Sequence, residues 1–222
     1  MEHTGDRPPR PKPRHTLEGI TDAAIAIADA EGLEAVTMQR VAERIGSTKM
    51  GLYRYLPGRS DLDAAMLDRA LGTPPAIAGP DWRRALTIWA EMMFARVLER
   101  PWAVELAQRP HVPGPTELTW YEAGLAPTAE LPLTAGERLD VLALLSGHAQ
   151  SLVRQQAQSA IPEDDLAARI APLLTANADR YPRTAAAFAE AGREDSRNRA
   201  FDFGVQRILA GVAALVSERA PG

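Results

Sequence analysis

Between residues 37 and 56, cationic and phenolic side chains recur at the spacing of one helix face. Lys49, Tyr53 and Arg54 fall on the outward side of a short predicted helix, whereas Leu52 falls on its inward side. Ammonium and guanidinium groups pair with phosphate oxygens or with guanine edges, and phenol hydroxyls donate to phosphate oxygens. The pattern therefore indicates a helix that enters a nucleic-acid groove.

Two short predicted helices position these side chains, and they meet at Gly46. The first helix begins after Thr37, a suitable N-cap, and the second runs from about Thr48 to Leu56. The inward-facing residues of the first helix are Val41, Ala42 and Ile45. Because glycine has no Cβ, Gly46 permits a tight turn, and the segment predicts a helix-turn-helix.

The elements around this motif are also helical. A helix from Thr16 to about Gly32 precedes it, and a helix capped by Ser60 follows it, so residues 16–71 form a predicted helix-turn-helix DNA-binding domain with three principal helices. The Gly- and Pro-rich stretch 72–80 is the predicted junction to a larger domain over residues 81–222.

The larger domain shows helix periodicity throughout. We predict helices over residues 81–100, 118–125, 136–158 and 195–219, a loop-rich stretch after Pro101, and further helical segments after Pro162 with breaks near Pro172 and Pro182. The sequence Thr134–Glu137 has the form of a capping box. No segment of useful length has strand periodicity, so the fold class is all-α with nine or ten helices.

A pocket for a small, largely apolar molecule is predicted in the larger domain, because aromatic and apolar residues cluster there with a few polar groups. Ordinary core packing is the alternative for each of these residues. The predicted pocket residues are Trp89, Met93, Arg96, Trp102, Leu106, Trp120, Tyr121, Leu144, His148 and Leu152.

Composition excludes several chemistries. The 222 residues include no cysteine, and the four histidines are far apart, so we expect no disulfide, no metal site and no cofactor. No apolar run reaches membrane-spanning length, and the polar start has no secretory pattern, so we expect a soluble cytoplasmic protein.

The formal net charge of −4 neither supports nor excludes DNA binding. Residues 1–15 hold four prolines and four basic residues, which predicts a disordered basic arm whose contact with DNA stays open.

The stretch Thr16–Leu67 resembles the DNA-binding domain of the TetR (tetracycline-repressor) family over the full length of that domain. The departures from the family pattern are Ser47, Met50, Leu56 and Arg59, and Arg59 keeps the charge of the usual lysine. The pattern of the family is matched at Thr37, Val41, Ala42, Ile45, Gly46, Thr48, Leu52, Tyr53, Tyr55, Arg59 and Leu62.

The resemblance implies roles for individual residues. Those expected to hold phosphates are Thr37, Tyr53, Tyr55 and Arg59, and those expected to face base edges are Gln39, Lys49, Met50, Gly51 and Arg54. Arg40 and Thr48 complete the expected set, and a solvated surface role is the alternative for Gln39 and Arg40.

A looser resemblance to the C-terminal domain of the tetracycline-repressor subgroup covers residues 81–110 and 139–156. It implies a homodimer through the helices near 136–158 and 195–219, binding to a palindromic operator, and release by a small effector. Glu105 stands where the tetracycline-binding member has a histidine, so tetracycline itself is not implied.

A helical enzyme and a helical interaction protein are the two alternatives to a regulator. A helical enzyme would need a catalytic constellation, and the acidic cluster Glu163–Asp165 lies at a helix start, where carboxylates are common. A helical interaction protein that does not bind DNA would leave the outward face of Lys49, Tyr53 and Arg54 without a purpose.

Overall fold

The computed structural model describes residues 15–77, 81–158, 163–191 and 199–220. Within these ranges the chain forms eleven α-helices, two short 3-10 helices and no strand, which confirms the all-α prediction. One helix more than expected is present because α6 (Trp102–Ala107) follows Pro101 in a stretch predicted as loop. The basic arm falls outside the described residues except for His15.

The N-terminal bundle consists of α1 (Leu17–Glu31), η1 (Leu33–Ala35), α2 (Met38–Arg44), α3 (Lys49–Leu52) and α4 (Arg59–Leu71). Thr16, Thr37 and Thr48 cap α1, α2 and α3: each hydroxyl accepts a hydrogen bond of 3.1 Å from the backbone N–H three residues later. Such caps contribute about 1 kcal/mol each. Sequence therefore fixes where these three helices begin.

Gly46 makes the turn between α2 and α3 with a φ of +64°. A side chain in this left-handed conformation costs about 1–2 kcal/mol, so glycine is favoured there. The turn lets α3 pack against α2, which packs against α1, and α1 packs against α4. Val41, Leu52, Leu62 and Met66 are each fully buried in the core. The predicted helix-turn-helix geometry is thus present in α2 and α3.

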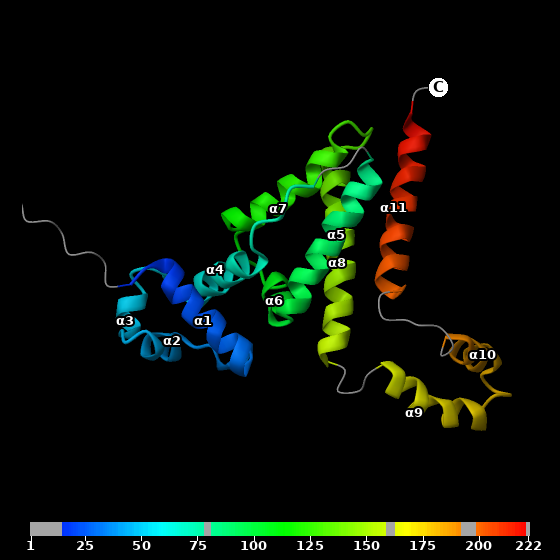
Figure 1. The fold of residues 1–222 in the computed structure, drawn as a ribbon, viewed down its shortest axis with the longest axis horizontal. Coiled ribbons are helices and arrows are strands. Elements are labelled where there is room, and N and C mark those ends of the chain that lie inside the picture. Colours follow the sequence, from blue (N-terminus) through cyan, green and yellow to red (C-terminus); the bar gives the residue numbers. More distant parts are fainter. Residues whose placement is uncertain (1–14, 78–80, 159–162, 192–198, 221–222) are drawn as a thin grey trace, which may run out of the picture.

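The C-terminal bundle contains α5 (Trp82–Glu99), α6, α7 (Pro115–Leu125), η2 (Ala126–Thr128), α8 (Ala135–Gln158) and α11 (Arg199–Arg219). Its centre is α8, which packs against α5 on one side and α11 on the other (Figure 1). The capping box before α8 is confirmed, since Thr134 N–H donates to Glu137 and Glu137 N–H donates to Thr134 Oγ1.

Glu137 also ties α8 to the end of α11. Arg219 donates to both carboxylate oxygens of Glu137, at 2.7 and 2.8 Å. The hydrogen bond from Arg219, followed by that from the Thr134 backbone, lowers the pKa of Glu137 to about 2. The two long helices are therefore fastened at the end remote from the N-terminal bundle (Figure 1).

Two further helices, α9 (Glu163–Ala176) and α10 (Pro182–Ala191), contact each other and lie apart from the C-terminal bundle (Figure 1). The break predicted near Pro172 is absent, because α9 continues through it. A proline fits helical φ and removes one hydrogen bond, so it does not always end a helix. Pro182 does begin a helix, at a position where its missing N–H is not needed.

Candidate nucleic-acid interface and internal cavity

α3, which ends at Leu52 and not at the predicted Leu56, and the turn after it carry two cations that have no acidic partner among the described residues. Lys49, Met50 and Arg54 are exposed, Met50 to 74%, and neither cation forms an ion pair within the described residues. The Lys49 ammonium lies 5.8 Å from the centre of the Tyr53 ring. Because an unpaired surface cation keeps its full charge for a partner, this face suits a polyanion.

The polar residues of α2 differ, since they already have partners in the chain. Arg40 donates to both oxygens of Glu31 at 2.7 and 2.8 Å, and Gln39 donates to Glu43 at 2.6 Å. The hydrogen bond to Glu31, and then its charge, raises the pKa of Arg40 above its ordinary value. To contact DNA, Arg40 must give up its hydrogen bonds to Glu31, and Gln39 must give up its hydrogen bond to Glu43.

The other predicted DNA-contact residues of the helix pair also contribute to its structure. Thr37 and Thr48 are N-caps, and a capping hydroxyl keeps its own O–H for another acceptor. Gly51 donates its backbone N–H to the Thr48 cap, and a Cβ there would lie 2.7 Å from the Ser47 hydroxyl oxygen, which would have to move. Tyr55 is half-buried against the core.

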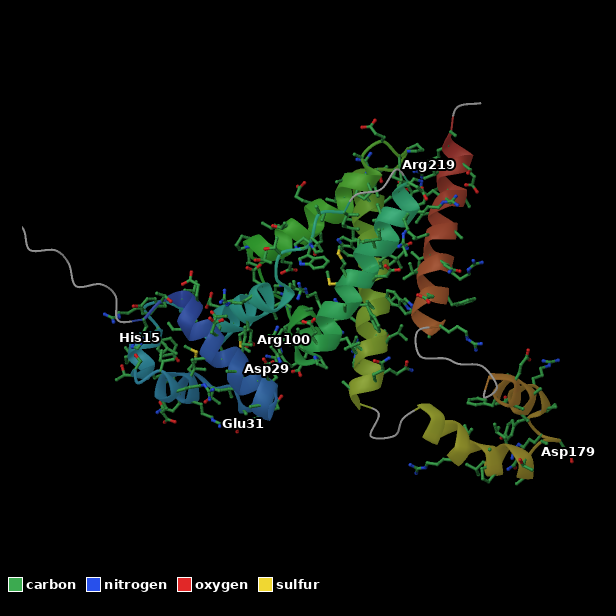
Figure 2. The ribbon with its side chains drawn as sticks, viewed as in Figure 1. His15, Asp29, Glu31, Arg100, Asp179 and Arg219 are labelled. Atoms are coloured by element: carbon green, nitrogen blue, oxygen red, sulfur yellow. The ribbon has the colours of Figure 1, made fainter. Side chains whose placement is uncertain are left out.

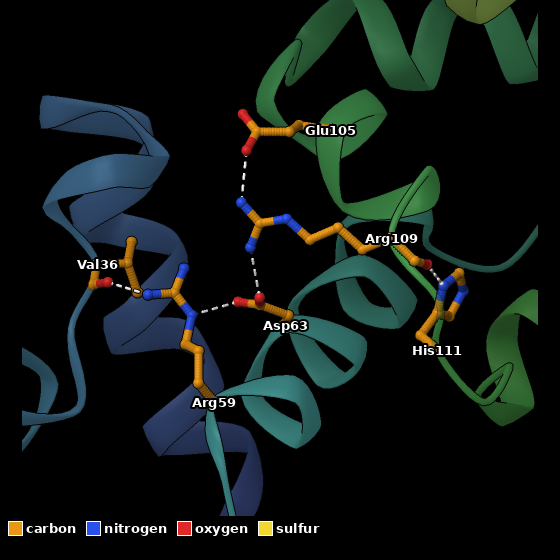
Figure 3. Close-up of polar contacts among 6 residues, drawn as sticks. All are labelled: Val36, Arg59, Asp63, Glu105, Arg109 and His111. Atoms are coloured by element: carbon orange, nitrogen blue, oxygen red, sulfur yellow. Dashed lines mark hydrogen bonds and ion pairs between the residues drawn. The ribbon is translucent and has the colours of Figure 1, made fainter.

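Arg59 has partners other than the expected phosphate. Its Nε donates to Asp63 at 2.5 Å, and its terminal nitrogen donates to the carbonyl of Val36, immediately before the α2 cap (Figure 3). The guanidinium therefore fastens the start of α4 to the start of α2. Arg59 therefore has acceptors inside the chain, and its phosphate contact stays a prediction.

Asp63 extends this contact to the C-terminal bundle. The second oxygen of Asp63 accepts from Arg109 at 2.7 Å, and Arg109 also donates to Glu105 of α6 at 2.5 Å (Figure 3). The Asp63 side chain is only 10% exposed, so its charge requires these cations. Arg109 and Asp63 are 46 positions apart in the sequence, so local patterns do not show this contact.

A second polar contact joins the two bundles at α1. Asp29 accepts from the indole N–H of Trp102 at 2.8 Å and from Arg100 at 3.3 Å, and Figure 2 shows Asp29 and Arg100 at facing positions. Trp102 thus anchors α6 on α1. It was predicted in the pocket, and the structure places it at this junction instead.

A cavity of about 900 Å³ lies between α4, α5, α7 and α8. Four of the ten predicted pocket residues line it, namely Trp89, Met93, Trp120 and Tyr121. Leu67 and Leu71 of α4 also line it, so the N-terminal bundle forms part of the wall. The other lining residues are Val97, Ala107, Glu117, Leu118, Glu122, Leu125, Leu139, Asp140, Leu142, Ala143, Ser146, Gly147 and Gln150.

Three predicted pocket residues on α8 face elsewhere. Leu144, His148 and Leu152 are spaced by four, so they share a different face from the lining residues of α8. His148 stacks on Phe201 of α11 with ring centres 5.9 Å apart and lies 3.2 Å from the Phe201 carbonyl oxygen, whereas Leu144 is 57% exposed. Helix periodicity alone could not show which face meets the cavity.

Two more predicted pocket residues lie outside the lining. Arg96 forms an ion pair with Glu99 on the partly exposed side of α5, with 3.6 Å between nitrogen and oxygen. Leu106 is fully buried in the core beneath α6. Leu106 therefore has the core role that was the alternative, whereas Arg96 and Trp102 are half-buried outside the cavity lining.

His111 is a functional candidate that sequence reasoning missed. One ring nitrogen lies 2.8 Å from the Arg109 carbonyl and the other lies 3.0 Å from the Glu117 carboxylate. Since both neighbours accept hydrogen bonds, the ring satisfies both only as the cationic imidazolium. Burial alone lowers the pKa of His111, but the hydrogen bonds to Arg109 and Glu117 raise it above 6.5 overall.

Glu117 connects this histidine to α4 and to the cavity. Its backbone N–H donates to Asp68 of α4 at 2.8 Å, and its side chain lines the cavity. Within the described residues, no group of three or more His, Asp or Glu side chains is placed to hold a metal ion.

Comparison with known proteins identifies the family. Residues 20–66 match the family model of bacterial regulatory proteins of the tetR family, and residues 74–216 match that of the tetracyclin repressor-like C-terminal domain. The chain is 33% identical to the HTH-type transcriptional repressor DrrR1 of Streptomyces coeruleorubidus, over 97% of this chain and 84% of that protein. The chain therefore belongs to the tetR family and is a DNA-binding transcriptional regulator.

Solved structures have the same fold. Apo ActR from Streptomyces coelicolor matches with a TM-score of 0.81 at 23% identity, covering 93% of this chain and 99% of ActR. ActR in complex with actinorhodin matches with a TM-score of 0.79 at 21% identity, covering 91% and 98%.

The raised pKa of His111 predicts a pH-dependent contribution to stability. A group whose folded-state pKa is raised stabilises the fold fully below its unfolded pKa of about 6.5, and the contribution is lost as pH rises through the folded value. Wild type should exceed His111→Gln in free energy of unfolding by more at about pH 5.5 than at about pH 9. Urea unfolding at both pH values measures this difference, and Glu117→Gln should remove the same increment. A pH-independent gap between wild type and His111→Gln would contradict it.

Proposed function

We propose that the chain represses transcription by binding a palindromic operator as a homodimer, and that a small molecule in the cavity releases it. The observation that carries the proposal is the unpaired, exposed cationic face of α3, presented by a helix-turn-helix at one end of the molecule (Figure 1). One such helix contacts few base pairs, so specific affinity calls for two copies. We also propose a division into a DNA-binding domain over 16–71 and an effector and dimerisation domain over 81–222.

The proposed contacts follow the positions of the side chains. Those assigned to base edges are Gln39, Lys49, Met50, Gly51 and Arg54, and those assigned to phosphates are Thr37, Arg40, Thr48, Tyr53 and Tyr55. Arg40 and Gln39 would leave Glu31 and Glu43 on binding. Each cation brought to a phosphate releases a counterion, so affinity should fall with salt.

The names of similar proteins support repression and effector binding. The relative from Streptomyces coeruleorubidus is called a transcriptional repressor, and ActR has been solved with actinorhodin and with (S)-DNPA. In this chain the cavity has mainly apolar walls and a volume suited to a drug-sized molecule.

The unburied side of α11 supports a homodimer. This helix is long and apolar enough to cross a membrane by length and composition alone, yet only 28% of its most apolar window is buried in the chain. Phe203 is 65% exposed, and Leu144 of neighbouring α8 is 57% exposed. Nothing within 4 Å would meet a Cβ on Gly211, so a second helix could approach closely there. We infer that a second copy covers this face.

Release requires that the cavity act on α2 and α3, and α4 is the element that contacts both. Its residues Leu67 and Leu71 line the cavity, while its Arg59 holds the carbonyl before α2. Trp120 of the cavity wall donates to the carbonyl of Gly72 at the end of α4, at 2.7 Å. An effector that shifts α4 therefore changes the distance between the helix-turn-helix motifs of the two subunits. The equilibrium between the DNA-binding state and the released state can shift by no more than the difference in the effector's affinity for them.

Regulators of this family are generally not enzymes, and we propose no catalytic role for the chain. A cytoplasmic location fits a protein that binds DNA, and we propose it on that ground.

Lys49→Ala and Tyr53→Ala should each weaken binding to the upstream region of the protein's own gene by at least about tenfold, because each removes contacts in both subunits. Fluorescence anisotropy over a range of salt concentrations measures the affinity. Arg183→Ala is the matched control, since it removes an exposed cation on α10, away from the helix pair. Unchanged affinity for both variants of α3 would refute the DNA-binding assignment of this face.

Phe203→Glu should convert a dimer into a monomer of 24.0 kDa, because a carboxylate at the centre of an apolar interface is costly. Light scattering coupled to size-exclusion chromatography measures the mass. Val112→Glu is the control, because Val112 is 83% exposed outside α8 and α11. A wild-type mass equal to that of one chain would overturn the proposed dimer.

A further inference from the structure

The charged residues that line the cavity all have the same sign. They are Glu117 and Glu122 of α7 and Asp140 of α8, and no lysine, arginine or histidine belongs to the lining among the described residues. Because α7 and α8 form two walls of the cavity, carboxylates flank the space from both sides. A ligand entering it meets a negative potential.

Two of these carboxylates are not neutralised by the chain. Neither Glu122 nor Asp140 forms an ion pair or a side-chain hydrogen bond within the part of the chain that the structure describes. Glu117 differs, since His111 lies 3.0 Å from it and its side chain is 15% exposed. Burial, and then the charge of Glu117, raises the pKa of the neighbouring Tyr121, which is consistent with a negative field in the cavity.

The walls offer few hydrogen-bond donors to an anion. The indole N–H of Trp89 donates to the Trp120 carbonyl at 2.9 Å, and that of Trp120 donates to Gly72. The hydroxyl of Ser146 donates to the Leu142 carbonyl at 2.8 Å. These three donors are occupied. The Tyr121 hydroxyl and the Gln150 amide form no hydrogen bond within the described residues, but both are neutral, so an anionic group beside the carboxylates would meet no cationic partner in the lining.

The aromatic rings suit a cation for the same reason. Trp89 and Trp120 meet edge to face, with centres 6.1 Å apart and planes at 74°, and Tyr121 lies beside them in the lining. Ring faces attract organic cations, most strongly where water is excluded. Glu122 and Asp140 are themselves exposed, so they attract a cation at the solvent-accessible part of the cavity, with a strength that salt reduces.

We propose that this cavity selects organic cations with an aromatic body, the charged part held between Glu122 of α7 and Asp140 of α8 and the body against Trp89 and Trp120. The inference rests on the proposed function only in naming the effector class. Binding in the cavity can be measured without DNA, so the two proposals can fail separately.

A pair of ions with nearly the same shape and opposite charge tests the selection. Tetraphenylphosphonium and tetraphenylborate are titrated into the full chain by calorimetry. Tetraphenylphosphonium should bind at least about tenfold more tightly, since shape is matched and charge alone differs. Equal affinities, tighter binding of the borate, or binding of neither ion would overturn the proposal.

Variants show whether the selection arises in the cavity. Asp140→Asn and Glu122→Gln should each weaken tetraphenylphosphonium binding by about threefold to tenfold. The double variant should bind tetraphenylphosphonium and tetraphenylborate with equal affinity. Glu130→Gln is the charge-matched control, because exposed Glu130 does not line the cavity. If Glu130→Gln weakens binding as much as the cavity variants do, the preference belongs to the surface and the proposal is wrong.

A steric variant separates the cavity from other apolar surfaces. Gly147→Leu should reduce phosphonium binding by about tenfold or more, because Gly147 lines the cavity and a Cβ there meets nothing within 4 Å. Gly136→Leu is the matched control in the same helix, also with open space and outside the lining. Unchanged binding in Gly147→Leu would place the ion elsewhere and overturn the proposal. Cation binding that leaves the DNA affinity unchanged would instead contradict the effector role under the proposed function.

Discussion

A carboxylate buried between two guanidinium groups holds the N-terminal and C-terminal bundles in one arrangement. Asp63 accepts from Arg59, which also holds the carbonyl before α2, and from Arg109, which follows α6. A buried charge is tolerated only while its partners stay in place, so separating the bundles at this point is costly. The position of α2 and α3 relative to the cavity therefore depends on this contact.

The arrangement explains how a cavity and a DNA-binding face can influence each other across the chain. One helix, α4, contributes Met66 to the core under the helix-turn-helix and Leu67 and Leu71 to the cavity wall. At its end, Gly72 accepts from Trp120, and along its side Asp68 accepts from the backbone of Glu117. A change in the volume or charge of the cavity must then be accommodated by a helix whose first residue, Arg59, holds the carbonyl before α2.

Features set by local chemistry could be predicted from the sequence. The caps at Thr16 and Thr37, the turn at Gly46 and the capping box at Thr134 each depend on residues within four positions, and all are present. The cap predicted at Ser60 is absent, because α4 begins at Arg59 after Gly58 and has no side-chain cap. The cationic side of α3 follows from the same local periodicity. The helix pair and its exposed residues were therefore predicted well.

Features set by contacts between distant residues could not be predicted. Arg59 and Trp102 have partners 23 and 73 positions away, which local periodicity does not show. His148 was predicted in the pocket, but its position on α8 turns it toward α11. It packs against Gly204, and a Cβ built on Gly204 would lie 2.1 Å from the His148 ring. His111 gains its cationic state only when residues 108–114 bring it between two acceptors.

The account depends most directly on whether Asp63 and Arg109 are energetically coupled. A double-mutant cycle of Asp63→Asn and Arg109→Gln, measured by chemical unfolding, gives that coupling without reference to DNA or ligand. A coupling free energy of at least about 1 kcal/mol is predicted, because each single change leaves its buried or partly buried partner without compensation. Additive effects of the two substitutions would contradict the claim that this ion pair joins the two bundles.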